Sequence, residues 1–227
     1  MTGPTPRERA RLETLAAIKA LALEQLALGG AGQLSLRAIA RELNIVSSAI
    51  YRYYASRDEL ITALIVDAYS DLAGALEEAA GHDRRGARRR WSDTASALRR
   101  WAVAEPHRYA LIYGTPIPGY RAPRDTVAPA GRVIAALAAP LCGPGELPDE
   151  VAEAVRPSRA LRVQLDTAAA GLGLPVPPAT MQLVVTAIAG LLGLLTLELG
   201  GHFVGGFEPA DDLYAAYVDD VAGRFGL

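Results

Sequence analysis

A segment near residue 50 carries polar side chains whose chemistry suits binding to a polyanion. They are hydroxyl-bearing residues around one arginine, namely Ser47, Ser48, Tyr51, Arg52 and Tyr53. Hydroxyls near the start of a helix can bond to phosphate or to base edges, where the helix dipole also favours an anion. An arginine can reach a guanine edge or a phosphate. The segment therefore predicts contacts with nucleic acid, provided that it forms a helix with these side chains exposed.

A preceding helix and a tight turn are needed to hold this segment in place. Ser35 is suited to cap a short helix over residues 36–43, where apolar residues recur at helical spacing. Asn44 then tolerates the left-handed conformation that a tight turn requires. The sequence therefore predicts a short helix that ends in a turn just before the polar segment.

A second short helix follows the turn, and the pair has the spacing of a helix-turn-helix. Ser47 and Ser48 can cap this helix, which runs to about Tyr54. Ala49, Ile50 and Tyr54 can pack inward, which leaves the polar side chains on the outer face. In a helix-turn-helix the second helix lies in the major groove of DNA. An ordinary amphipathic hairpin, in which these groups are only solvated, is the alternative.

The parts of an enzyme are not recognisable in the rest of the chain. Its 227 residues suit one or two domains with a sizeable core, without disulfides or structural metal. One cysteine, Cys142, and three histidines occur, and none has a metal-ligand spacing. No nucleophile with a base and no phosphate-binding glycine loop is evident. We therefore expect no catalytic residue, no metal and no cofactor. A helical enzyme that uses the hairpin as scaffold is a remote alternative.

Targeting and charge patterns point to a cytoplasmic protein with a basic N-terminal part. The first 32 residues have no secretory leader, and the longest uncharged apolar run, residues 183–197, has 15 residues against the roughly 20 that cross a bilayer. Residues 1–60 hold eight basic and six acidic side chains, whereas residues 111–227 hold seven and twelve. A polyanion is thus expected to meet the N-terminal part.

Helical periodicity recurs along the whole chain and strand signals are nearly absent. The sequence therefore predicts an all-α fold of about nine or ten helices. A first helix carries apolar residues from Leu12 to Leu26, and Ser56 with Glu59 forms a capping box that opens a long fourth helix to about Gly81. The later helices are expected over residues 87–104, 106–113, 127–141, 149–170, 178–202 and 210–225.

The sequence of residues 36–64 resembles the DNA-binding domain of the TetR family of one-component transcriptional regulators; it reads LRAIARELNIVSSAIYRYYASRDELITAL. The run AIYRYYASRDEL is the most specific part. This resemblance implies a helix-turn-helix domain over residues 1–55, a connecting helix over 56–80, and an effector-binding and dimerisation domain over 81–227. Beyond residue 81, WAVAEPHRYALIYG and LLGLLTLELGGHF resemble a subgroup marked by Trp and His before a Gly in the penultimate helix. Here Gly190 is present, but Val185 and Ala189 occupy the other two positions.

By this resemblance, eight residues match DNA-contacting positions of the family. Ser35 matches a phosphate contact, Arg37 a base contact, and Arg57 a basic residue that commonly contacts phosphate. The others match the recognition helix: Ser47, Ser48, Tyr51, Arg52 and Tyr53. The family often has Ser where this chain has Val46, so capping is expected to shift to Ser47.

Candidate residues for a ligand and for a dimer lie in the second domain. Aromatic surface and a few polar groups for a moderately apolar molecule come from Trp101, His107, Tyr109 and Tyr113. Core packing is the alternative for each aromatic. The last two helices are expected to pair with a second copy as a four-helix bundle, through Ala187, Gly190, Leu194 and Tyr217. A buried central helix of a monomer is the alternative.

These features together predict a homodimeric repressor that binds a palindromic operator and leaves it when a small effector binds. A DNA-binding activator or an architectural protein without a small ligand is the alternative.

Overall fold

The structure is a computed structural model that describes residues 5–81, 86–143 and 147–227. Within these ranges the chain contains helices and no strand, which confirms the all-α fold. Its helices are α1 (Pro6–Gly29), η1 (Ala31–Gln33), α2 (Leu36–Glu42), α3 (Ser47–Ile50), α4 (Arg57–Ala80), α5 (Ala87–Ala104), α6 (Pro106–Tyr113), η2 (Arg124–Thr126), α7 (Val127–Ala138), α8 (Asp149–Ala154), α9 (Arg159–Leu172), α10 (Pro178–Leu199) and α11 (Asp211–Arg224).

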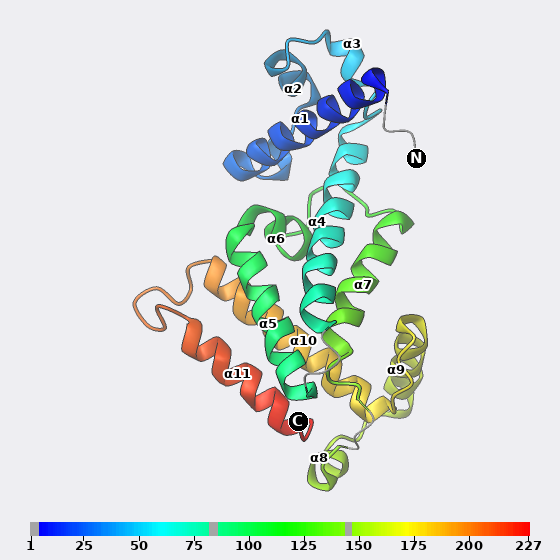
Figure 1. Cartoon of the computed structure of the whole chain (residues 1–227), viewed down its shortest axis with the longest axis vertical. Coiled ribbons are helices and arrows are strands. Elements are labelled where there is room, and N and C mark those ends of the chain that lie inside the picture. The colour runs from blue at the N-terminus through cyan, green and yellow to red at the C-terminus, as the bar shows by residue number, and fades with distance from the viewer. Residues whose placement is uncertain (1–4, 82–85, 144–146) are drawn as a thin grey trace. The chain divides into compact units, whose positions relative to one another are not determined.

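The chain folds into two compact units. The first comprises residues 1–68 and 107–126, and so holds α1, α2, α3, α6 and the first half of α4. The second comprises residues 69–106 and 127–227. Within the first unit α1, α2 and α3 lie next to one another, and within the second α5, α10 and α11 do (Figure 1).

Most predicted helices agree with the structure to within a few residues, and one is wrong. α5 and α6 cover their predicted ranges. The single helix predicted over 149–170 is instead two, α8 and α9. Pro157 lies between them, and it lacks the backbone N–H of a helix interior and forces the preceding residue out of helical conformation. The described residues therefore hold eleven α-helices, one more than the upper expected number.

The core of the first unit is built from one apolar face of each short helix. Ile18 of α1, Ile39 of α2, Ile50 of α3 and Leu60 of α4 are all fully buried. Ile18 and Ile39 are among the apolar residues at helical spacing that were predicted for α1 and α2. The burial holds α3 against α2, so that its opposite face is left exposed.

The core of the second unit is centred on α5, α10 and α11. Trp91 of α5 is fully buried, and its indole N–H donates to the backbone carbonyl of Val218 at 2.9 Å. The Tyr214 hydroxyl of α11 donates to the carbonyl of Ala95 at 2.8 Å. These two bonds satisfy buried polar groups and fix α11 along α5.

α10 is longer than the apolar run from which it was predicted. The helix has 22 residues, and its most apolar window has a mean hydropathy of 1.9 with 39% of its residues buried. Among the described residues it is thus long and apolar enough, by length and composition only, to cross a membrane. It packs against α5, α7, α9 and α11, which makes it the central helix of the second unit. Core helices of soluble proteins share this composition.

Candidate nucleic-acid interface

The N-terminus of α2 is held by two side chains. The Ser35 hydroxyl accepts a hydrogen bond from the Ala38 N–H at 3.3 Å, which confirms the predicted N-cap. The Ser35 N–H in turn donates to the side chain of Gln25, in the last turns of α1, at 2.9 Å. The start of α2 is therefore fixed both to its own first turn and to α1.

The turn between α2 and α3 has the predicted conformation. Asn44 adopts a positive φ of 53°. The Ile45 N–H donates to the Ala40 carbonyl at 3.0 Å, which closes the end of α2. An L-residue with a short polar side chain tolerates this conformation better than others do.

α3 is shorter than predicted, and its cap is different. The N-cap is Val46, whose side chain cannot accept a hydrogen bond, so the predicted capping by Ser47 and Ser48 is wrong. Regular α-helix ends at Ile50 and is followed by a turn in which the Tyr53 N–H bonds to the Ile50 carbonyl at 2.9 Å. The predicted extent to Tyr54 is therefore one α-helical turn continued by a tighter 3₁₀-like turn.

The polar residues of α3 and of the turn that follows it are mainly exposed. Ser47, Ser48, Tyr51 and Arg52 are exposed, whereas Ile50 and Tyr54 are buried, as predicted. Tyr53 is half-buried, and the Arg11 guanidinium lies 5.8 Å from the centroid of its ring. This contact places Tyr53 at the edge of the surface rather than at its centre.

Exposed guanidinium groups are also present on α2 and directly after α3. Arg37 and Arg41 are one helical turn apart on α2, and they, like Arg52, are exposed and have no ion pair within the part of the chain that the structure describes. Arg41 was not among the predicted contacts, and its spacing from Arg37 was the available signal. Unpaired arginines on one surface are suited to phosphate.

The start of α4 is capped much as predicted. The Ser56 hydroxyl accepts from the Glu59 N–H at 3.1 Å, and the Glu59 carboxylate accepts from the Ala55 N–H at 2.6 Å. Arg57 beside them is half-buried and lies 3.5 Å from a carboxylate oxygen of Asp58. Arg57 is thus more restrained than Arg52.

The predicted ligand residues do not line a single cavity of either unit. In the second unit Trp101 is buried, and its indole N–H donates to Asp71 at 2.9 Å. In the first unit His107 is exposed, and the buried Tyr109 stacks obliquely on Tyr113 with ring centroids 5.3 Å apart. Tyr109 is therefore packed in the core, which was the stated alternative to a ligand contact.

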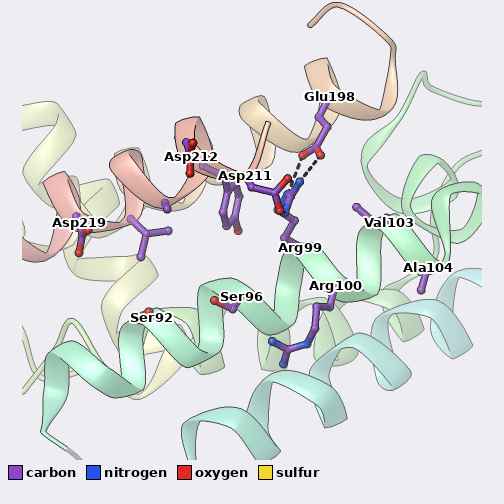
Figure 2. A pocket seen from close by; sticks show the side chains of 13 residues that line it. Ser92, Ser96, Arg99, Arg100, Val103, Ala104, Glu198, Asp211, Asp212 and Asp219 are labelled. Carbon is purple, nitrogen blue, oxygen red and sulfur yellow. Dashed lines mark hydrogen bonds and ion pairs between the residues drawn. The ribbon is translucent and has the colours of Figure 1, made fainter. Parts of the chain in front are cut away.

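An open groove of about 850 Å³ runs along α5 and α11 in the second unit. Figure 2 shows Arg99 at its centre, pointing to Glu198 and Asp211, with Arg100 pointing away from them. Arg99 donates to both Glu198 oxygens, at 2.6 and 3.0 Å, and to Asp211 at 2.7 Å. These bonds hold the pKa of Asp211 below its ordinary value and raise the pKa of Arg99. Nothing in the sequence predicted this cluster, because Glu198 lies 99 residues from Arg99.

The predicted dimer residues are partly used within one chain. Ala187 is buried, and Tyr217 of α11 packs directly over Gly190, with its hydroxyl donating to the Ala187 carbonyl at 3.0 Å. Leu194 and Tyr217 are half-buried. A separate stripe of uncharged residues along α10 is exposed at four-residue spacing: Val185, Ala189, Gly193 and Leu197.

No group of metal-ligating side chains is found among the described residues. Burial raises the pKa of the Cys142 thiol, so this cysteine is not activated as a nucleophile.

Two family profiles match the chain. Residues 18–64 match the profile "Bacterial regulatory proteins, tetR family". Residues 91–221 match the profile "Tetracyclin repressor-like, C-terminal domain". The first match contains the helix-turn-helix, and the second contains α10 and most of α11.

Relatives with known names are also similar over most of the chain. The HTH-type transcriptional regulators Rv1816 of Mycobacterium tuberculosis and Mb1846 of Mycobacterium bovis are 41% identical over 207 residues, which cover 87% of this chain and 85% of each relative. The solved structure of the regulatory protein SCO4313 is 39% identical with a TM-score of 0.77, covering 96% of this chain and 100% of that one. A protein of unknown function from Rhodococcus sp. RHA1 is 26% identical with a TM-score of 0.63, covering 92% and 93%.

Proposed function

Because the chain belongs to the TetR family of transcriptional regulators, we propose that it is a homodimeric, ligand-responsive repressor of a palindromic operator. A protein of this family is a regulator and not an enzyme. In the proposed organisation of this chain, residues 1–55 bind DNA and residues 81–227 bind the effector and dimerise. The helix α4 connects these two domains. As a regulator of transcription, it is proposed to act in the cytoplasm.

The observation that carries the proposal is the exposed surface of α2 and α3. It combines three guanidinium groups that have no ion pair in the described ranges with the hydroxyls at the start of α3. The contacts we propose are the eight predicted ones: Ser35, Arg37, Ser47, Ser48, Tyr51, Arg52, Tyr53 and Arg57. Within this set, exposed Arg37 and Arg52 read bases, Tyr51 and Tyr53 contact the DNA backbone, and the restrained Arg57 anchors a phosphate.

The dimer is proposed through the exposed side of α10 together with α11. Val185 and Leu197 are 46% and 42% exposed, and the residues between them on the same stripe are Ala and Gly. Small uncharged residues let two helices approach closely, and water is a poor partner for this face. Leu194 and Tyr217 flank the stripe, whereas Ala187 and Gly190 support it from within. A two-fold dimer matches a palindrome whose half-sites are one turn of DNA apart.

The effector acts through a coupling free energy between two sites. A typical coupling of about 1–3 kcal/mol changes operator affinity by about 5- to 150-fold. Of the predicted ligand contacts, His107 and Tyr113 remain proposed within the first unit, and Trp101 remains proposed separately within the second.

Selection of DNA from a random duplex library by the purified protein tests the proposal. We expect a palindrome with half-sites about 10 base pairs apart. Gel shifts on this palindrome then test the ligand response. Recovery of no motif, with weak binding that moderate salt abolishes, would contradict sequence-specific regulation. Reporter output from the recovered site in a deletion strain separates repression from activation.

Variants separate base reading from anchoring. Arg52→Ala should weaken specific binding by about 1–3 kcal/mol through loss of a base contact. Arg57→Ala should weaken all sequences alike and flatten the salt dependence. Arg159→Ala, at an exposed arginine of α9, is the matched control and should change neither. If only Arg57→Ala changed the sequence preference, the two roles would be reversed.

A further inference from the structure

A second, smaller cavity lies inside the first unit, next to the helix-turn-helix. It has a volume of about 290 Å³ and lies between the last turn of α1, the glycines that follow α1, and α6 with its C-terminal loop. Leu26, Ala110, Leu111 and Ile117 supply apolar wall. The volume is at the lower end of the range for small-molecule sites, so it suits a compact ligand.

Two polar groups line this otherwise apolar cavity. They are the His107 imidazole at the start of α6 and the Thr115 hydroxyl in the loop after it. Both residues are exposed, so the cavity is open to a ligand from solvent. Apolar walls with one or two polar groups favour a small, mainly apolar ring with a single hydrogen-bonding group.

The cavity wall is continuous with the segment that positions α2. Gly30 and Gly32 line the cavity and belong to the connection from α1 to α2. Leu26 of the wall is the neighbour of Gln25, whose side chain holds the Ser35 N–H. A molecule in the cavity therefore touches Leu26, next to Gln25, and two glycines of the connection that leads to the N-cap of α2, where the proposed DNA surface begins.

The opposite wall is held by contacts to α4. The Asp67 carbonyl of α4 accepts from Arg108 of α6 at 3.3 Å, whereas the Asp67 carboxylate accepts from Lys19 of α1 at 2.5 Å and so holds α1 to the same helix. The Thr62 and Tyr120 hydroxyls share a hydrogen bond of 2.9 Å, which ties the loop after α6 to α4. Because α6 and its loop are held in this way, an occupant of the cavity is expected to displace the short, glycine-rich α1–α2 connection rather than α6.

We propose that this cavity is a regulatory site for a small, mainly apolar aromatic molecule, and that its occupation weakens operator binding by disturbing the start of α2. The regulatory half of this inference rests on the proposed function, whereas ligand binding itself does not. The site lies within the first unit and needs no residue of α5, α10 or α11.

The probe for the test is indole, titrated at millimolar concentration into the full chain labelled at isoleucine methyls. We expect the Ile117 methyl resonance to shift saturably, since fragments of this size bind in that range. Ala110→Trp should lower indole affinity by at least about tenfold, because it places an indole ring in the cavity from an exposed position of α6. Ala20→Trp is the matched control, at an exposed alanine of α1 outside the cavity, and should bind indole as the natural chain does.

Operator binding gives an independent readout. Saturating indole should weaken binding of the natural chain to its selected operator by about 5- to 150-fold, and Ala110→Trp should show this loss without indole. Circular dichroism and the smaller variant Ala110→Leu check that the loss is not caused by misfolding. An unshifted Ile117 resonance, or equal indole affinity of Ala110→Trp and Ala20→Trp, would overturn the site. Indole binding without any change in operator affinity would overturn its regulatory role and leave the proposed function standing.

Discussion

Replacement of Gly190 by alanine tests the packing of α11 on α10. A methyl group at this position would overlap the Tyr217 hydroxyl and lie 3.0 Å from ring carbon Cε2. The ring has to move, which breaks its bond to the Ala187 carbonyl at a cost of about 1 kcal/mol. Overpacking of this kind costs about 1–3 kcal/mol in all, and the gain in helix propensity over glycine offsets about 1 kcal/mol. We expect a net destabilisation of up to about 2 kcal/mol.

Thermal unfolding followed by circular dichroism measures this loss, as a midpoint lowered by up to about 4–8 °C for a chain of this size. Gly131→Ala in α7 is the matched control, because a methyl group there meets no atom within 4 Å. It should raise stability by up to about 1 kcal/mol through helix propensity alone. The double variant with Tyr217→Ala should remove the overlap, so that Gly190→Ala then stabilises. If Gly190→Ala were as stable as Gly131→Ala, the reasoning would be refuted.

Three further changes test local features. Asn44→Ala should destabilise the chain by about 1 kcal/mol because the position has positive φ, whereas Asn44→Gly should not; urea unfolding compares them. Ser35→Ala should lower the free energy of unfolding by about 1 kcal/mol through loss of the α2 cap, and should weaken operator binding less than Arg52→Ala does. An unchanged free energy of unfolding would contradict the role of Ser35 as a cap. Arg132 holds the pKa of Glu77 below its ordinary value of 4.5, so the unfolded chain binds more protons. The natural chain should thus unfold at a higher urea concentration than Arg132→Gln at neutral pH. This difference should vanish as the pH falls through the lowered pKa of Glu77.

Features decided by neighbours along the chain were predictable. The cap at Ser35, the left-handed turn at Asn44 and the Ser56 cap depend on atoms within four residues, so residue type and spacing are enough to find them. The break between α8 and α9 belongs to this class as well. Pro157 was its signal, and the apolar periodicity on both sides concealed it.

Features decided by packing were not predictable. Gly190 indicated close approach of a helix, but only the tertiary structure shows that the helix is α11 of the same chain. Arg99 meets Glu198 and Asp211 from α10 and α11, and the small cavity joins the end of α1 to α6.

The sequence alone thus determined the helical fold, the helix-turn-helix and the polar residues of α3, because hydrophobic periodicity and capping are local properties. The tertiary structure decided which side chains are unpaired on the surface and which cavities exist. Those depend on contacts between residues about 30 to 140 positions apart, such as Arg88 with the Leu227 carbonyl, whose geometry follows only from how the helices pack.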